Sequence, residues 1–189
     1  MEFCGHADGN CSASCCRVYF LVIKDLIEKQ TGTLSLTSTD FENNGVFHKD
    51  FVCDTLDGKN VNPALSIVNQ PAETLSMAIT MVDTTATATS LNATHWFLWN
   101  IPPNTTDIAR NSVPEGATQG KNYLDTNKYE GPCPPPNEEH TYVFTLYCLS
   151  EVIETTDLIT IPVFLEAIRH LILKEVSLTG KYNNIVADP

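Results

Sequence analysis

The chain has 189 residues, of which 42% are hydrophobic and 18% charged, a composition typical of one soluble globular domain. Its formal net charge is −12 at pH 7, so its long-range field repels nucleic acid and anionic lipid surfaces, and we expect neither as a partner. A local pocket that holds one phosphate remains compatible with this charge.

Residues 1–32 are expected to form an N-terminal extension, partly disordered or with a short helix over residues 17–31. The first 16 residues hold four of the seven cysteines and His6, but without the paired spacing of a zinc site, so we expect no metal. An odd cysteine count with irregular spacing argues against a disulfide scaffold and favours a reducing, cytoplasmic compartment. No segment has the pattern of a signal peptide or of a membrane-spanning helix.

From residue 33 the pattern changes to β-branched and alternating segments, which predict one mainly β domain over residues 33–189. A long polar excursion over residues 103–130 is typical of a functional or disordered loop. Pro162 begins an amphipathic helix that is expected to reach about Leu173, and a short strand or turn follows over residues 176–182. The main strands are expected over residues 33–37, 63–67, 76–82, 94–101 and 141–149.

The loop before the last of these main strands contains four prolines within residues 132–136. Proline fixes φ and removes a hydrogen-bond donor, so this loop is rigid and poor in donors. It leads directly to His140. A stiff loop that presents a histidine at a strand end is typical of a pocket wall, while a purely structural proline loop is the alternative at this point.

Polar side chains stand at the ends of three predicted strands, with Asp83 ending one, His95 starting the next and His140 starting a third. They converge if the strands are neighbours in one sheet, and with Tyr142 and backbone N–H groups they would suit an anion such as phosphate. Two histidines and a carboxylate also fit a metal site, and hydrogen-bonded core histidines are a third interpretation. A hydrolase is disfavoured because there is no nucleophile elbow and Cys133 lies among prolines.

Motifs in a fixed order resemble the phosphatidylethanolamine-binding proteins, and more closely their bacterial and archaeal Raf-kinase-inhibitor-like branch. The likeness runs from about residue 33 to 182. Its segments are Leu36-Thr37-Ser38, Gly58-Lys59-Asn60-Val61-Asn62-Pro63, Thr94-His95-Trp96-Phe97-Leu98-Trp99-Asn100-Ile101-Pro102, Pro114-Glu115-Gly116-Ala117, Gly131-Pro132-Cys133-Pro134-Pro135-Pro136, His140-Thr141-Tyr142-Val143-Phe144 and Ala167-Ile168-Arg169-His170.

This resemblance implies a large antiparallel sheet packed on a smaller sheet, with a C-terminal helix and a small pocket for phosphate or phosphorylated head groups. It implies a non-enzymatic protein without a cofactor, which modulates a partner such as a kinase and forms a homodimer. The residues that fall on the family's pocket are Asp83, His95, Gly131, Pro132, His140 and Tyr142.

One departure concerns the family's Asp-Pro-Asp-Ala-Pro segment, which is here Asp83-Thr84-Thr85-Ala86-Thr87. The second aspartate and both prolines are missing, so we expect a less preorganised loop over residues 83–90. An inhibitory interaction protein with a vestigial pocket is therefore the alternative function, and a hydrolase or metal enzyme is the third.

Overall fold

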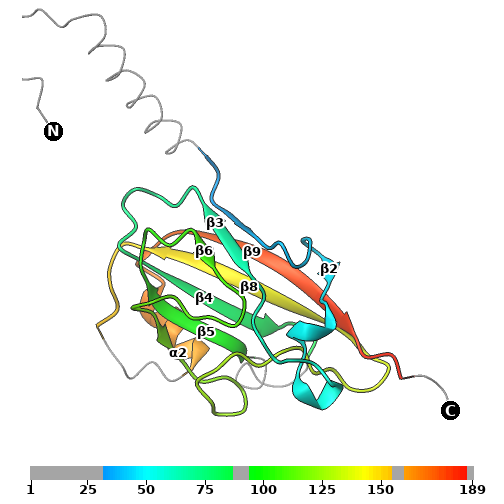
Figure 1. Ribbon diagram of the computed structural model, residues 1–189. Coiled ribbons are helices and arrows are strands. Elements are labelled where there is room, and N and C mark those ends of the chain that lie inside the picture. Colours follow the sequence, from blue (N-terminus) through cyan, green and yellow to red (C-terminus); the bar gives the residue numbers. More distant parts are fainter. Residues whose placement is uncertain (1–31, 87–93, 155–159, 187–189) are drawn as a thin grey trace, which may run out of the picture. The chain divides into compact units, whose positions relative to one another are not determined.

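The computed structural model describes residues 32–86, 94–154 and 160–186. Residues 1–31 lie outside these ranges, so the N-terminal extension predicted over residues 1–32, with its short helix and its cysteines, remains a prediction. The chain divides between Thr33 and Leu34 into two units, and the elements labelled in Figure 1 belong to the second.

The larger of the two sheets in the described residues has the strand order β2-β9-β8-β4-β5-β7. Its long central strands are rich in β-branched and aromatic residues, which fit a pleated and buried surface. Every pairing is antiparallel except that of β2 with β9, which is parallel. The strands are β2 (Gly45–Val46), β4 (Ser76–Asp83), β5 (Thr94–Ile101), β7 (Thr118–Gln119), β8 (Glu139–Leu149) and β9 (Ile172–Asn183).

The smaller sheet packs on one face of the larger one. It contains β1 (Ser35–Thr37), β3 (Leu65–Val68) and β6 (Asp107–Ile108), in the order β1-β3-β6. Two 3-10 helices, η1 (Lys49–Phe51) and η2 (Asp54–Leu56), lie between β2 and β3 in the sequence. The side chains between the sheets form the main core, and they include Leu36, Ile67, Met81, Trp96 and Phe144. The predicted mainly β fold of two packed sheets is confirmed.

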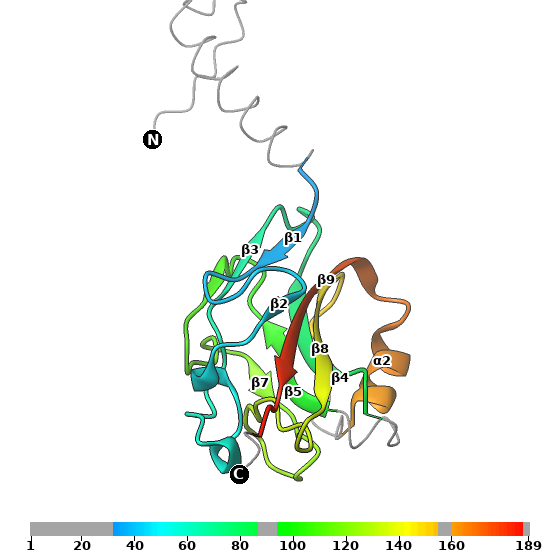
Figure 2. The same cartoon turned by 90° about the vertical axis from the view of Figure 1, so that its right-hand side faces the viewer.

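Helix α2 (Ile161–Ile168) covers the opposite face of the large sheet (Figure 2). Phe164 is fully buried there and packs edge-on against Phe97, with ring centroids 4.6 Å apart. Successive residues along β4 and β5 face the two cores in turn, so both faces of these strands are buried. This explains why the strands appear almost continuously apolar in the sequence.

The predicted helix that reaches Leu173 is too long, because α2 ends at Ile168. Leu171 lies in a turn, where its N–H donates to the carbonyl of Ile168, and Ile172 begins β9. Both residues pack in the same core as the helix. The 3–4 spacing therefore continued past the helix because a turn and a strand supply its last apolar residues.

The final strand is longer than predicted, since β9 spans residues 172–183 rather than 176–182. Its first half contains the exposed residues Leu173, Lys174 and Glu175. Charged residues on an exposed stretch of a strand remove the alternating apolar signal, so the sequence showed only the second half, which contains the buried Leu178 and Gly180.

One disulfide is present, although the cysteine spacing argued against a disulfide scaffold. Cys53 and Cys133 are joined, with their Cα atoms 5.5 Å apart and a sequence separation of 80. Spacing rules describe small cysteine-rich scaffolds and do not register two cysteines that the fold brings together. The inference of a reducing compartment loses its basis, because disulfides persist mainly in oxidising compartments. A cytoplasmic location remains a prediction.

Candidate anion-binding site

Three neighbouring strands bring the predicted polar residues to one end of the large sheet. Strand β4 lies between β5 and β8 and is antiparallel to both. Asp83, the last residue of β4, therefore lies at the same end of the sheet as His95 near the start of β5 and His140 near the start of β8. This strand order meets the condition under which the sequence predicts a pocket.

A β-bulge turns His95 toward the other site residues. Met81 pairs with Trp96, whereas Val82 pairs with Thr94, so β5 carries one extra residue at His95. Bulges commonly redirect a side chain at the edge of a sheet. The His95 ring meets the ring of Tyr142 edge-on, with centroids 5.0 Å apart.

Asp83 is a buried carboxylate with both oxygens engaged. Its Oδ2 lies 2.6 Å from His140 Nδ1, and its Oδ1 accepts from the N–H groups of Thr85 at 2.9 Å and Ala86 at 3.1 Å. The carboxylate thus fixes the histidine and the start of the following loop at once. The loop predicted to lack preorganisation is held as far as Ala86, and residues 87–93 lie outside the described residues.

His140 lies between two carboxylates. Glu138 Oε2 lies 3.1 Å from Nε2, on the opposite side of the ring from Asp83. Burial acts to lower the pKa of His140, but the hydrogen bonds and negative charges of Asp83 and Glu138 outweigh it, so the net shift is upward. The imidazolium form is therefore favoured.

His95 has the opposite electrostatic environment. It is almost fully buried, and burial lowers its pKa, although a hydrogen bond to the carbonyl of Glu130 and the charge of Asp83 act in the other direction. Its Nδ1 lies 2.8 Å from that carbonyl oxygen. A carbonyl can only accept, so Nδ1 carries the proton of the neutral ring.

Tyr142 contributes a buried hydroxyl without a hydrogen-bond partner in the described residues. Burial, followed by the charge of Asp83, raises the pKa of this phenol well above its usual value, so the hydroxyl keeps its proton. Asp83 and the backbone of Cys133 lie close enough to affect that pKa, but neither completes a hydrogen bond with it. A buried donor without a partner is rare and suits a ligand.

The proline-rich loop is fixed beside this cluster. The N–H of Gly131 donates to Asn60 Oδ1 at 2.7 Å, and the carbonyl of Pro132 accepts from the N–H of Cys53 at 3.1 Å. A Cβ at Gly131 would lie 2.3 Å from the carbonyl oxygen of Phe51, so only glycine fits here. The disulfide of Cys133 adds a covalent link to the same neighbouring segment.

Sequence reasoning missed two residues of this cluster. Tyr123 packs against His95, with ring centroids 4.9 Å apart, and Glu138 contacts His140. Tyr123 lies within the long polar excursion, where no periodic signal marks it. Glu138 stands two positions before His140, a spacing that places two side chains on one face of a strand and could have indicated the contact.

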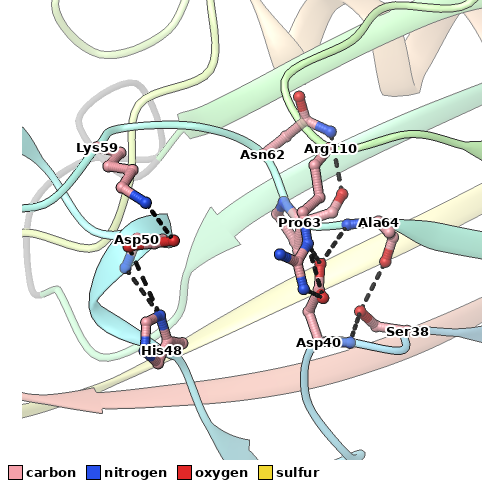
Figure 3. Close-up of polar contacts among 9 residues, drawn as sticks. All are labelled: Ser38, Asp40, His48, Asp50, Lys59, Asn62, Pro63, Ala64 and Arg110. Atoms are coloured by element: carbon pink, nitrogen blue, oxygen red, sulfur yellow. Dashed lines mark hydrogen bonds and ion pairs between the residues drawn. The ribbon is translucent and has the colours of Figure 1, made fainter.

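A second polar cluster lies around Asp40 and Arg110, and Figure 3 shows its contacts. The fully buried Asp40 carboxylate accepts from Arg110 Nε at 2.8 Å and from the N–H of Ala64 at 2.7 Å. Burial acts to raise the pKa of Asp40, but the hydrogen bonds from Arg110 and Ala64 reverse this and lower it. The Arg110 guanidinium also lies over the ring of Phe51, 5.4 Å from its centroid.

The hollow beside this cluster, of about 330 Å³, also includes His48 and Asp50. Asp50 is paired with Lys59 at 2.8 Å, and its N–H donates to His48 Nδ1. The acidic groups here already have basic partners. We therefore interpret the cluster as a clamp between the loop after β1 and the start of β3, rather than as a ligand site.

Neither a metal-ligand cluster nor a membrane-spanning helix is present in residues 32–86, 94–154 and 160–186. No group of three or more histidine, cysteine or acidic side chains there could hold a metal ion. No helix in these ranges is long and apolar enough to cross a bilayer.

The family model described as phosphatidylethanolamine-binding protein matches residues 37–183. The chain belongs to the phosphatidylethanolamine-binding protein family. The match covers every residue of the candidate site. Relatives of this family member include a UPF0098 protein of the archaeon Methanothermobacter thermautotrophicus, 34% identical over 154 residues, which cover 79% of this chain and 98% of the relative.

Two solved structures show the same fold. A putative phosphatidylethanolamine-binding protein homologue from Chlamydia trachomatis has a TM-score of 0.73 and 27% identity, over 81% of this chain and 99% of its own. Escherichia coli YbcL, described as a member of the mammalian family, has a TM-score of 0.74 over 80% of this chain and 99% of its own; at 23% identity it supports the fold alone. These relatives confirm the predicted likeness to bacterial and archaeal family members. The Raf-kinase-inhibitor-like character of the branch remains a prediction. The role of the six site residues remains a prediction.

Proposed function

We propose that this family member is a non-enzymatic binding protein whose pocket takes phosphate or a phosphorylated head group. The observation that carries the proposal is the buried, unpartnered hydroxyl of Tyr142, whose ring contacts the rings of both His95 and His140. Phosphate oxygens are strong acceptors, and this cluster offers them a phenolic donor beside an imidazolium. Gly131 and Pro132 would form the wall of the pocket.

The hydrogen bonds of His140 support binding rather than catalysis. An imidazole that activates a nucleophile is oriented by a carboxylate through one nitrogen and holds the nucleophile at the other. Here Asp83 takes the first position, but the second nitrogen meets the carboxylate of Glu138, which has no proton to give up. The proposal therefore assigns His140 an electrostatic role.

Modulation of a protein partner such as a kinase, and a homodimeric state, extend this proposal on the family likeness alone. The vestigial-pocket alternative is favoured by one observation, which is that both nitrogens of His140 are already bonded within the protein. Under that alternative, the double variant His95→Ala, His140→Ala keeps its binding to a partner kinase. Loss of partner binding in this variant would contradict it.

Nuclear magnetic resonance of the histidine side chains tests the main proposal. During titration with inorganic phosphate, and separately with phosphoethanolamine, the ring signals of His95 and His140 should shift with one shared dissociation constant. The exposed His170 serves as the reference and should not follow that curve. The variant Tyr142→Phe should weaken binding about tenfold or more, since a hydrogen bond to a charged group contributes about 1.5–3 kcal/mol. Unchanged signals of both histidines at millimolar ligand would refute the proposal.

A further inference from the structure

The two carboxylates that flank His140 differ in exposure and in attachment. The Asp83 side chain is 6% exposed and has further bonds to the loop after β4, whereas the Glu138 side chain is 57% exposed. The ion pair to Asp83 is also the shorter, at 2.6 Å against 3.1 Å. Asp83 is therefore the fixed partner of His140, and Glu138 is the exchangeable one.

The backbone of Glu138 is held while its side chain is exposed. Its N–H donates to the carbonyl of Pro135 at 3.2 Å, and its carbonyl accepts from the N–H of Asn184 at 3.1 Å. The carboxylate can consequently leave His140 by side-chain rotation, without any movement of the loop. Exposed side chains change rotamer within nanoseconds, so this exchange is fast compared with ligand binding.

The two contacts favour the charged form of His140. Ionised carboxylates only accept hydrogen bonds, so both ring nitrogens of His140 donate and the ring carries one positive charge. Together with Asp83 and Glu138, the three side chains carry a net charge of about −1. An incoming anion thus finds the Nε2–H group occupied and a negative charge beside it.

We infer that Glu138 competes with the anion for this site. Its carboxylate accepts the hydrogen bond from His140 Nε2–H that a phosphate oxygen would otherwise accept. The inference rests on the proposed function and adds a residue that sets its affinity. The anion binds by displacing Glu138. Its affinity therefore reflects the difference in free energy between the anion's contact with the imidazolium and the Glu138 contact that it replaces.

Glu139 provides a matched control. It neighbours Glu138 in the sequence and carries the same charge, but its carboxylate pairs with Lys181 at 3.9 Å. Glu139→Gln therefore removes one negative charge near the site without touching His140. Glu138→Gln removes the competing charge, and Glu138→Ala removes the side chain altogether.

Calorimetric titration with inorganic phosphate at constant ionic strength tests the inference. We expect Glu138→Gln to bind about threefold to fivefold more tightly than the parent protein, the size expected when an ion pair with one half-exposed partner is removed. Glu138→Ala should bind at least as tightly as Glu138→Gln, and Glu139→Gln should stay within about twofold of the parent. Equal gains at both positions would mean a general charge effect, and weaker binding in Glu138→Gln would make Glu138 part of the pocket; either result overturns the inference.

The pKa of His140, measured by nuclear magnetic resonance without ligand, separates this inference from the proposed function. The groups facing His140 are Asp83, Glu138 and Tyr142, with Tyr182 as its register partner on β9. The pKa should fall in Glu138→Gln and stay unchanged in Glu139→Gln. If the pKa responds in this way but neither the parent nor any variant binds phosphate, the proposed function fails and the competitor role fails with it. If the parent binds phosphate and Glu138→Gln binds no more tightly, only the competitor role fails.

Discussion

Loss of the disulfide between Cys53 and Cys133 should destabilise the fold strongly. The two cysteines are 80 positions apart, so the link restricts a large loop of the unfolded chain. The chain-entropy relation for that separation gives about 4.5 kcal/mol at 25 °C. The N–H of Cys53 also donates to the carbonyl of Pro132, a hydrogen bond that does not require the crosslink. The crosslink therefore acts mainly on the unfolded chain.

Thermal unfolding with and without a phosphine reductant measures the effect. For a chain of this length, about 4.5 kcal/mol corresponds to a fall in Tm of roughly 9–18 °C. The double variant Cys53→Ala, Cys133→Ala is the control, because its Tm should be low at the outset and should not respond to the reductant. A reduced parent protein that unfolds within about 2 °C of the oxidised one would refute this reasoning.

Three further changes probe the site loop, the ion pair and the second core. Gly131→Ala should cost about 1–3 kcal/mol in urea unfolding, because the new Cβ would lie 2.3 Å from a backbone carbonyl oxygen. Asp83→Asn should lower the pKa of His140 in a nuclear magnetic resonance titration, and an unchanged pKa would mean that the pair does not form in solution. Because the folded pKa of His140 is raised, this pair stabilises the fold fully below the unfolded pKa of about 6.5, and the contribution is lost as the pH rises through the folded pKa. Phe164→Ala should cost about 3–5 kcal/mol, whereas Val163→Ala, at a 53% exposed position, should change the free energy of unfolding by under about 1 kcal/mol.

The convergence of Asp83, His95 and His140 could be predicted from sequence because each residue interrupts a long apolar strand at its end. When three such strands are neighbours in one antiparallel sheet, the ends that carry the polar residues meet at one end of the sheet. The order of the family motifs along the chain supported this arrangement. The bulge at His95 was not predictable, because a single extra residue leaves the apolar pattern of residues 94–101 almost unchanged.

Contacts made by loops escaped the sequence for a different reason. Tyr123 reaches His95 because a loop folds back onto β5, and Cys53 reaches Cys133 because two distant connecting segments meet in the folded chain. No period of two or 3.6 residues encodes such a meeting, which depends on where each loop leaves its sheet. The end of α2 at Ile168 was missed because the apolar spacing continues beyond the helix. Residues of α2, of the turn after it and of β9 share one core, and together they mimic the pattern of a single helix.

The pKa values of the two histidines of the site are shifted in opposite directions. Burial lowers the pKa of His95, whereas two carboxylates raise the pKa of His140 in spite of its burial. Environments that move the pKa values of neighbouring groups apart assign them distinct roles. A bound anion would add negative charge beside both rings, but His140 would exchange one negative partner for another, and only His95 would gain a new one. The larger change in pKa on phosphate binding should therefore fall on His95, and its direction should be upward.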